Sequence, residues 1–203
     1  MQTNFQQKEY VDYDEYVKHQ AEKLFILRGA KNGMATLKEF DKRYRKRLGI
    51  RIGTLPFITH GKRVLCLGAR GGGEVEAFID LGCFAIGIDL APATDSYVLR
   101  GDFNNIQFAD SSVDVVFSNA LDHANPIEKM VEETSRVLCS RGYFIVETIR
   151  DDNDNSKDRW ASCWWKDHWD IITLFENSGY SLINEINSDN DFYQYMLSFQ
   201  KNV

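Results

Sequence analysis

A stretch of small residues lies between a short apolar segment and a helical pattern. The apolar segment is Val64–Leu67, and the helical pattern starts near Glu74. Five residues between them are candidates for contacting a ligand: Gly68, Ala69, Arg70, Gly71 and Gly72. Glycines let the backbone turn sharply and approach a ligand closely, and a helix N-terminus offers free N–H groups. The pattern predicts a nucleotide-like ligand, although many different nucleotide-binding proteins share such a loop.

Two aspartates downstream are placed to complete such a site. Asp89 ends the apolar run Ala85–Ile88, roughly 20 residues after the first glycine, and its carboxylate can accept both ribose hydroxyls of an adenosine. Leu90 beside it is placed to pack on the adenine face. Asp102 can accept a hydrogen bond from the adenine amino group, and Phe103 offers a backbone N–H. Because the carboxyl ends of parallel strands meet at one edge of a sheet, these features predict a single adenosine-shaped site.

Short apolar runs alternate with amphipathic segments after Pro56, which is typical of βαβ units. The runs predicted to be strands are Val64–Leu67, Phe84–Ile88, Val113–Phe117 and Tyr143–Val146. The helices predicted between them are Glu74–Leu81 and Ile127–Leu138. Because these strands are apolar almost throughout, we expect an α/β fold whose mostly parallel sheet is covered by helices on both faces.

The two ends of the chain add features to this core. Glu9–Phe25 and Ala35–Leu48 carry apolar residues near helical spacing, which predicts extra N-terminal helices. Ser181–Ile186 and Phe192–Phe199 are strand-like and too close in sequence for a parallel crossover, so they predict a C-terminal antiparallel hairpin. With no linker or repeat in the sequence, we expect one domain over residues 1–203. Residues 1–55 would form a helical cover and residues 56–203 the core.

Composition and charge exclude several classes of protein. The 203 residues carry a formal net charge of −6, which disfavours generic nucleic-acid binding because phosphate contacts reward a positive face. The four cysteines form no C-x-x-C pair and lack zinc-ligand spacing, so no metal site is expected. Met1–Tyr16 lacks the basic-then-apolar order of a signal peptide, and no apolar stretch approaches the ~20 residues of a membrane span. These features predict a soluble, cytoplasmic protein.

The ordered set of motifs resembles the class I methyltransferases that use S-adenosyl-L-methionine (SAM), in the small-molecule branch typified by the methyltransferase 11 domain. The resemblance extends from Lys62 to Glu147. Besides the glycine loop, it rests on Gly87-Ile88-Asp89, Gly101-Asp102-Phe103, Phe108 to Asn119, Asp122-His123, Glu133 to Leu138 and Arg141-Gly142-Tyr143. It implies a Rossmann-like fold with SAM as the cofactor. It also implies that Asp89 holds the ribose, that Asp102 holds the adenine, and that Asn119 is a further cofactor contact.

Two residues depart from the family pattern. The family usually has an acid two residues before the first glycine, where this chain has Cys66, and a second glycine where this chain has Arg70. The missing acid often helps to position the loop and the methionine part of SAM. Arg70 could compensate by pairing with the methionine carboxylate. The alternative is that Arg70 is a solvated loop residue.

The resemblance implies methyl transfer to a small-molecule acceptor, on oxygen or nitrogen, with an anionic, sugar or lipid-linked acceptor among the options. Such a transfer is an in-line displacement, so positioning can supply most of the acceleration. A base is needed only where the acceptor must lose a proton. His123 is the best candidate because it follows the fourth strand, and Asp122 is the neighbour that would orient it. Otherwise His123 caps the helix that starts near Pro126, or packs in a loop.

Three other functions fit less well. A nicotinamide-dependent oxidoreductase also uses a glycine loop, but this loop does not read G-x-G-x-x-G from Gly68, and a terminal hairpin is foreign to that fold. A catalytically inactive SAM-binding fold, acting as a regulatory or binding subunit, is favoured by Cys66 and Arg70 but opposed by the presence of both aspartates. A nucleic-acid methyltransferase lacks support because residues 118–121 do not form the N-P-P-Y or D-P-P-Y run of enzymes that flip a base.

Four tryptophans follow the polar segment 151–158, at positions Trp160, Trp164, Trp165 and Trp169. In this fold such a segment borders the acceptor site, so a substrate lid is one interpretation. Core packing of the following helix is the other, and the i,i+4 spacing of Trp165 and Trp169 favours it for that pair.

Overall fold

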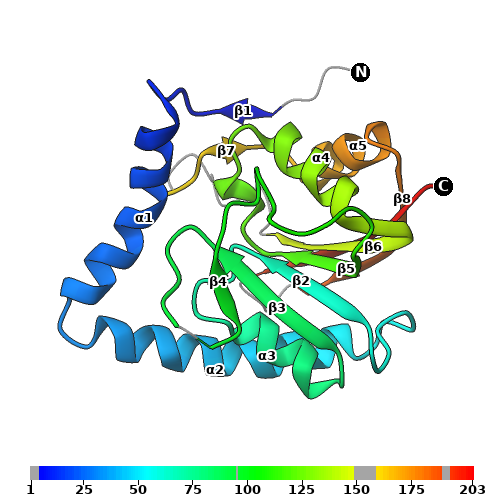
Figure 1. Cartoon of the computed structure of the whole chain (residues 1–203), viewed down its shortest axis with the longest axis horizontal. Helices are drawn as coiled ribbons and strands as arrows, with labels where there is room; N and C mark the ends of the chain where they lie inside the picture. Colours follow the sequence, from blue (N-terminus) through cyan, green and yellow to red (C-terminus); the bar gives the residue numbers. More distant parts are fainter. Residues whose placement is uncertain (1–4, 95, 149–158, 189–192) are drawn as a thin grey trace.

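A seven-stranded sheet forms the centre of the computed structural model, which describes residues 5–94, 96–148, 159–188 and 193–203 (Figure 1). The strands are β2 (Arg63–Leu67), β3 (Phe84–Asp89), β4 (Val98–Arg100), β5 (Val113–Ser118), β6 (Leu138–Thr148), β8 (Tyr180–Asn187) and β9 (Tyr195–Lys201). Their order is β4-β3-β2-β5-β6-β9-β8. Neighbours from β4 to β6 are parallel, whereas β9 runs antiparallel to both β6 and β8. The mostly parallel sheet and the C-terminal hairpin confirm the predicted fold class.

Helices cover both faces of this sheet, as the apolar strands predict. Figure 1 shows α2 (Gly33–Ile52) and α3 (Gly73–Asp80) on one face, with α4 (Ile127–Val137) and α5 (His168–Asn177) on the other. Strand β2 contributes side chains to both hydrophobic cores, because successive side chains point to opposite faces of the sheet. Leu65 and Leu67 pack in the core beneath α4 and α5, whereas Val64 and Cys66 pack in the core beneath α2 and α3.

The N-terminal part of the chain is attached to the segment that follows residue 158. Strand β1 (Gln6–Gln7) pairs antiparallel with β7 (Cys163–Trp164), a small sheet that the sequence did not predict. Helix α1 (Tyr13–Gly29) then stands at the left of Figure 1, at one end of the main sheet. Within α1, Gln20 donates hydrogen bonds to Oγ of Ser162 at 2.7 Å and to the carbonyl of Trp160 at 3.2 Å.

Several element bounds differ from the predicted ones for local reasons. Helix α1 starts later than the predicted Glu9, because Asp12 has extended backbone and caps the helix by accepting from the Glu15 N–H at 2.9 Å. Strand β4 has three residues and was not predicted. The predicted strand Phe192–Phe199 begins outside the described residues, and β9 starts at Tyr195. Within the part of the chain that the structure describes, no helix is long and apolar enough to cross a bilayer.

The tryptophan pair does not share one environment. Trp165 is buried, with 7% of its surface exposed, and its ring lies 5.9 Å from that of Phe5. Trp169 is 60% exposed, so the prediction that it packs in the core is wrong. The reason is that α5 begins only at His168, with Asp167 as its cap, so the two tryptophans are not one turn apart on a helix. The predicted lid segment, residues 151–158, lies outside the described residues.

Candidate active site

The glycine loop connects β2 to α3 and is tied to the end of β3. The N–H groups of Gly68 and Ala69 both donate to the carbonyl of Ile88, at 2.9 and 3.1 Å. Gly68 has a φ of 74°, and a Cβ at this position would come within 2.5 Å of the Ala120 Cβ. A side chain here would therefore require a strained backbone and would collide with the segment after β5, which is why glycine is needed.

Asp89 lies at the carboxyl end of β3, and its carboxylate connects two loops. Its Oδ2 accepts from the backbone N–H of Arg70 at 3.0 Å, and its Oδ1 accepts from that of Ala91 at 2.7 Å. The residue is 8% exposed and faces a small cavity of about 30 Å³. This smaller cavity brings together six of the predicted residues: Gly68, Arg70, Asp89, Leu90, Phe103 and His123. It is also lined by Tyr16 and Gln20 of α1, which narrow it.

Asp102 follows β4, and its carboxylate is already engaged. Its Oδ1 accepts from the backbone N–H of Asn104 at 2.8 Å, and its Oδ2 accepts from the Tyr13 hydroxyl at 2.5 Å. Asp102 is not among the described residues that line the smaller cavity, whereas its neighbour Phe103 is. The first helix therefore covers the carboxylate that the sequence assigns to adenine.

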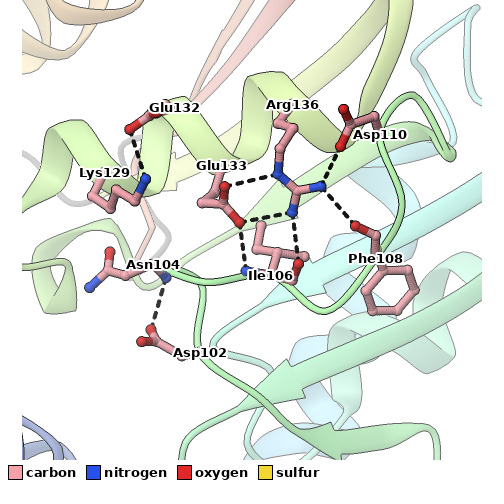
Figure 2. Close-up of polar contacts among 9 residues, drawn as sticks. All are labelled: Asp102, Asn104, Ile106, Phe108, Asp110, Lys129, Glu132, Glu133 and Arg136. Atoms are coloured by element: carbon pink, nitrogen blue, oxygen red, sulfur yellow. Dashed lines mark hydrogen bonds and ion pairs between the residues drawn. The ribbon is translucent and has the colours of Figure 1, made fainter.

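The loop that carries Asp102 is held by an ion pair on α4 (Figure 2). Glu133 accepts from the Ile106 N–H at 2.8 Å and from the Arg136 guanidinium at 2.9 Å. Arg136 in turn donates to the carbonyls of Ile106 and Phe108, at 2.8 and 2.9 Å. The Arg136 guanidinium holds the pKa of Glu133 below its usual value. Both residues belong to the motif set of the sequence, but their task of fixing this loop becomes visible only in the structure.

A larger cavity of about 370 Å³ adjoins the glycine loop. It shares Gly68, Arg70, Ala120 and His123 with the smaller cavity, so the two are neighbours at the same end of the sheet. Three more predicted residues line it, namely Ala69, Gly71 and Asn119. Much of the remaining wall is aromatic and apolar, with two polar residues beside it: Leu27, Leu37, Phe40, Tyr44 and Tyr193, then Lys23 and Thr36. The last predicted loop residue, Gly72, lines an adjoining cavity of about 220 Å³, which shares Leu37, Asp41 and Gly71 with the larger one.

Two acids of the larger cavity, Asp41 and Glu74, were not predicted as site residues. Burial, with a smaller effect from Glu76, raises the pKa of Asp41 to about 6, against the opposing effect of Arg70. Burial raises the pKa of Glu74 to about 8, and neighbouring carboxylates including Asp41 add to it. Asp41 lies so close to the loop that a Cβ on Gly71 would be 1.8 Å from its Oδ2. The run Gly71-Gly72-Gly73 is the signal in the sequence that another segment approaches here.

His123 ends the short helix η1 (Leu121–His123) after β5 and lines both cavities. Its Nδ1 lies 2.9 Å from the carbonyl of Trp160. Since a carbonyl only accepts, Nδ1 carries a proton, and in the neutral ring Nε2 is the unprotonated nitrogen. Nε2 is 3.9 Å from Oδ2 of Asp122, beyond hydrogen-bond distance. The ring is therefore oriented by the Trp160 carbonyl, a partner that no sequence pattern indicates.

A comparison with protein families finds one match. The model of the methyltransferase 11 family, described as a methyltransferase domain, matches residues 65–146. This range contains the glycine loop, both aspartates and His123. No curated protein is significantly similar in sequence.

Solved structures share the fold over most of the chain. A chain from the complex between the Haloferax volcanii Trm112 methyltransferase activator and a methyltransferase has a TM-score of 0.69 at 19% identity, covering 93% of this chain and 98% of that one. A Burkholderia thailandensis 1,6-didemethyltoxoflavin-N1-methyltransferase, solved with its substrate and S-adenosylhomocysteine, has a TM-score of 0.70 at 11% identity, covering 97% and 93%. A SAM-dependent methyltransferase from Aquifex aeolicus has a TM-score of 0.61 at 15% identity, covering 82% and 96%.

Proposed function

Because residues 65–146 match the methyltransferase 11 family, we propose that the chain transfers a methyl group from SAM to a small-molecule acceptor. One observation carries this proposal. Gly68, Asp89 and Phe103, from three separate connections, face one cavity at the carboxyl ends of the strands. That edge of a doubly wound sheet is where nucleotide ligands bind.

The residues of this cavity fit SAM. The Asp89 carboxylate can accept from the ribose hydroxyls, and Leu90 and Phe103 can pack on the adenine ring. Asp102, which lies outside the lining of this cavity, can accept from the adenine amino group once Tyr13 releases it. The Nε of Arg70 is buried and has no hydrogen-bond partner in the described part of the chain, which suits a donor to the methionine carboxylate. SAM supplies a methyl group on a positively charged sulfur, which departs as a thioether.

We assign the acceptor to the aromatic side of the larger cavity, beside the methionine part of SAM at Arg70. The cavity's volume of about 370 Å³ lies in the range of small-molecule sites, and its aromatic walls suit a compact organic molecule that attacks the methyl carbon through oxygen or nitrogen. The net charge of −6 argues against a nucleic-acid acceptor. The Burkholderia thailandensis neighbour, a small-molecule methyltransferase, supports this choice at the level of the fold.

Within the reaction, His123 is assigned the role of a general base. Its Nε2 is unprotonated in the neutral ring and can receive the proton that an acceptor loses as the new bond to carbon forms. Asp122 lies near enough to favour the imidazolium that results, without orienting the ring directly. Where the acceptor is already a free amine, positioning by the cavity suffices.

We further infer that residues 1–55 act as a cover on a core formed by residues 56–203, within one domain. Three contacts of α1 support this organisation. Tyr13 bonds Asp102, the Tyr16 hydroxyl donates to the carbonyl of His123 at 3.1 Å, and Gln20 bonds Ser162. All three reach connections at the cofactor edge of the sheet.

The test is calorimetric titration with S-adenosylhomocysteine, followed by incubation with methyl-labelled SAM and a pool of small metabolites. We expect binding, loss of at least about tenfold in affinity for Asp89→Asn, and label transfer to one acceptor class. No binding to the intact protein would reject the proposal. Binding without transfer to any acceptor would instead favour a SAM-binding regulatory subunit.

A further inference from the structure

Two oppositely charged side chains line the larger cavity beside the glycine loop. Arg70 has a buried Nε without a hydrogen-bond partner, and Glu74 is 4% exposed. Among the described residues, no side chain forms a hydrogen bond or ion pair with the Glu74 carboxylate, which accepts only from its own backbone N–H. Ionising a buried carboxyl group that has no cationic partner is costly, so a ligand cation that pairs with Glu74 would stabilise its charged form.

Glu74 is the second residue of α3, directly after the glycine loop, and it lines the larger cavity. It contributes, after burial, to the raised pKa of the Cys66 thiol. It contributes likewise to the raised pKa of Tyr44 and of Tyr193, which both line the larger cavity. Glu74 therefore lies within electrostatic range of Cys66, the position at which the resembling family usually has its acid.

The methionine part of SAM is a zwitterion, with an ammonium and a carboxylate on one carbon. Arg70 and Glu74 line a cavity that adjoins the adenosine side through Gly68, and Lys23 and Asp41 line it as well, so groups of both signs are available there. Resting on the proposed function, we propose that Glu74 binds the α-ammonium group of SAM and so replaces the acid that is absent at Cys66. Glu74 is thus a positioning residue for the cofactor.

Asp41 is the rival carboxylate, and its surroundings differ. Arg70 is a cation that lowers the pKa of Asp41, and the Asp41 carboxylate lies against Gly71. The neighbours that shift the pKa of Glu74 are all carboxylates: Asp41, Asp89 and Glu147. Glu74 therefore lies among other acids, and the ammonium group would offset their negative charge.

The experiment compares two ligands that share the nucleoside and the sulfur. S-adenosylhomocysteine carries the amino-acid zwitterion, whereas 5′-methylthioadenosine does not. Dissociation constants for both are measured by calorimetry on the intact protein and on Glu74→Gln, which is nearly isosteric. Glu76→Gln is the matched control, because Glu76 is on the same helix but pairs with Arg45 at 2.8 Å and lies outside the larger cavity. Asp41→Asn tests whether Asp41, rather than Glu74, binds the ammonium group.

We expect Glu74→Gln to bind S-adenosylhomocysteine about tenfold or more weakly, and 5′-methylthioadenosine within about twofold of the intact protein. Retained binding of 5′-methylthioadenosine also shows that the variant is folded. An unchanged or tighter affinity of Glu74→Gln for S-adenosylhomocysteine would overturn the inference, as would a selective loss in Asp41→Asn alone. If the intact protein bound neither ligand, the proposed function itself would fail.

Discussion

The hydroxyl of Tyr13 donates a hydrogen bond of 2.5 Å to Oδ2 of Asp102, joining the first helix to the loop after β4. Burial, followed by the Asp102 carboxylate, raises the pKa of Tyr13, so its hydroxyl stays protonated and remains a donor at neutral pH. The same carboxylate is the one that we assign to the adenine amino group. The helix and the cofactor therefore compete for one acceptor oxygen.

Replacing Tyr13 by phenylalanine removes this competition. The net value of a hydrogen bond to a charged group is about 1.5–3 kcal/mol, of which only part is recovered when a ligand replaces the hydroxyl. We expect Tyr13→Phe to bind S-adenosylhomocysteine about threefold to tenfold more tightly. Calorimetry measures this. Tyr10→Phe is the control, because the Tyr10 hydroxyl bonds Ser162 rather than Asp102. Weaker binding by Tyr13→Phe would instead make Tyr13 a cofactor ligand.

Two adjacent acids on α4 test how the Asp102 loop is held (Figure 2). Glu133 bonds both Arg136 and the Ile106 N–H, whereas Glu132 is exposed and pairs with Lys129 at 2.9 Å. We expect Glu133→Gln to lower the free energy of unfolding by about 2 kcal/mol and to weaken S-adenosylhomocysteine binding a few-fold. Glu132→Gln should change stability by less than about 0.5 kcal/mol. Equal effects in denaturant titrations of the two variants would contradict this role.

Much of the fold could be predicted because apolar patterning specifies it directly. Strand β2 and helix α4 are found where the sequence places them, since a continuous apolar run and a strong amphipathic period leave little choice. The three-residue strand β4 and the two-residue pair of β1 and β7 carry no such pattern. They form because tertiary contacts supply their partners, as when the Gln6–Gln7 segment pairs with Cys163–Trp164.

The site was predictable where a backbone requirement selects the residue type. Gly68 must be glycine because of its φ and its approach to Ala120, so the sequence reveals it. Tyr13 and Asp41 could not be found this way, since an ordinary helical position becomes functional only through the packing of its helix on a distant loop. Glu74 was hidden for another reason: an acid in the first turn of a helix is commonplace, and only its burial makes it unusual.

Removing the Glu74 charge should change how stability depends on pH. The pKa of Glu74 in the folded chain is about 8, above its ordinary 4.5, so the folded state binds the proton more tightly than the unfolded state does. Stability that Glu74 contributes below pH 4.5 is therefore lost as the pH rises towards 8. We expect the melting temperature of Glu74→Gln to be close to that of the intact protein at pH 5 and several degrees higher at pH 9.

Glu76→Gln serves as the comparison for this melting series. Its carboxylate is partly exposed and paired with Arg45, so its removal should change the pH dependence of the melting temperature only slightly, through a small lowering of the pKa of Asp41. Other acids near Glu74 also titrate, including Asp41, whose pKa is about 6, but they are present in both variants. If the melting temperatures of Glu74→Gln and the intact protein changed with pH in the same way, the folded chain would not bury an ionised Glu74 at high pH.

Once an acceptor is identified, His123→Gln tests whether a base takes part in the transfer. Glutamine can still donate to the Trp160 carbonyl, so the segment around residue 160 should keep its place, but it cannot take up a proton. We expect kcat to fall by about 10²- to 10⁴-fold for a hydroxyl acceptor, with S-adenosylhomocysteine binding changed by less than about threefold. His60→Gln, at an exposed position, controls for the loss of an imidazole. If His123→Gln kept the full kcat, proton transfer to the Nε2 of His123 would not be part of the reaction. Positioning of the acceptor would then be the source of catalysis.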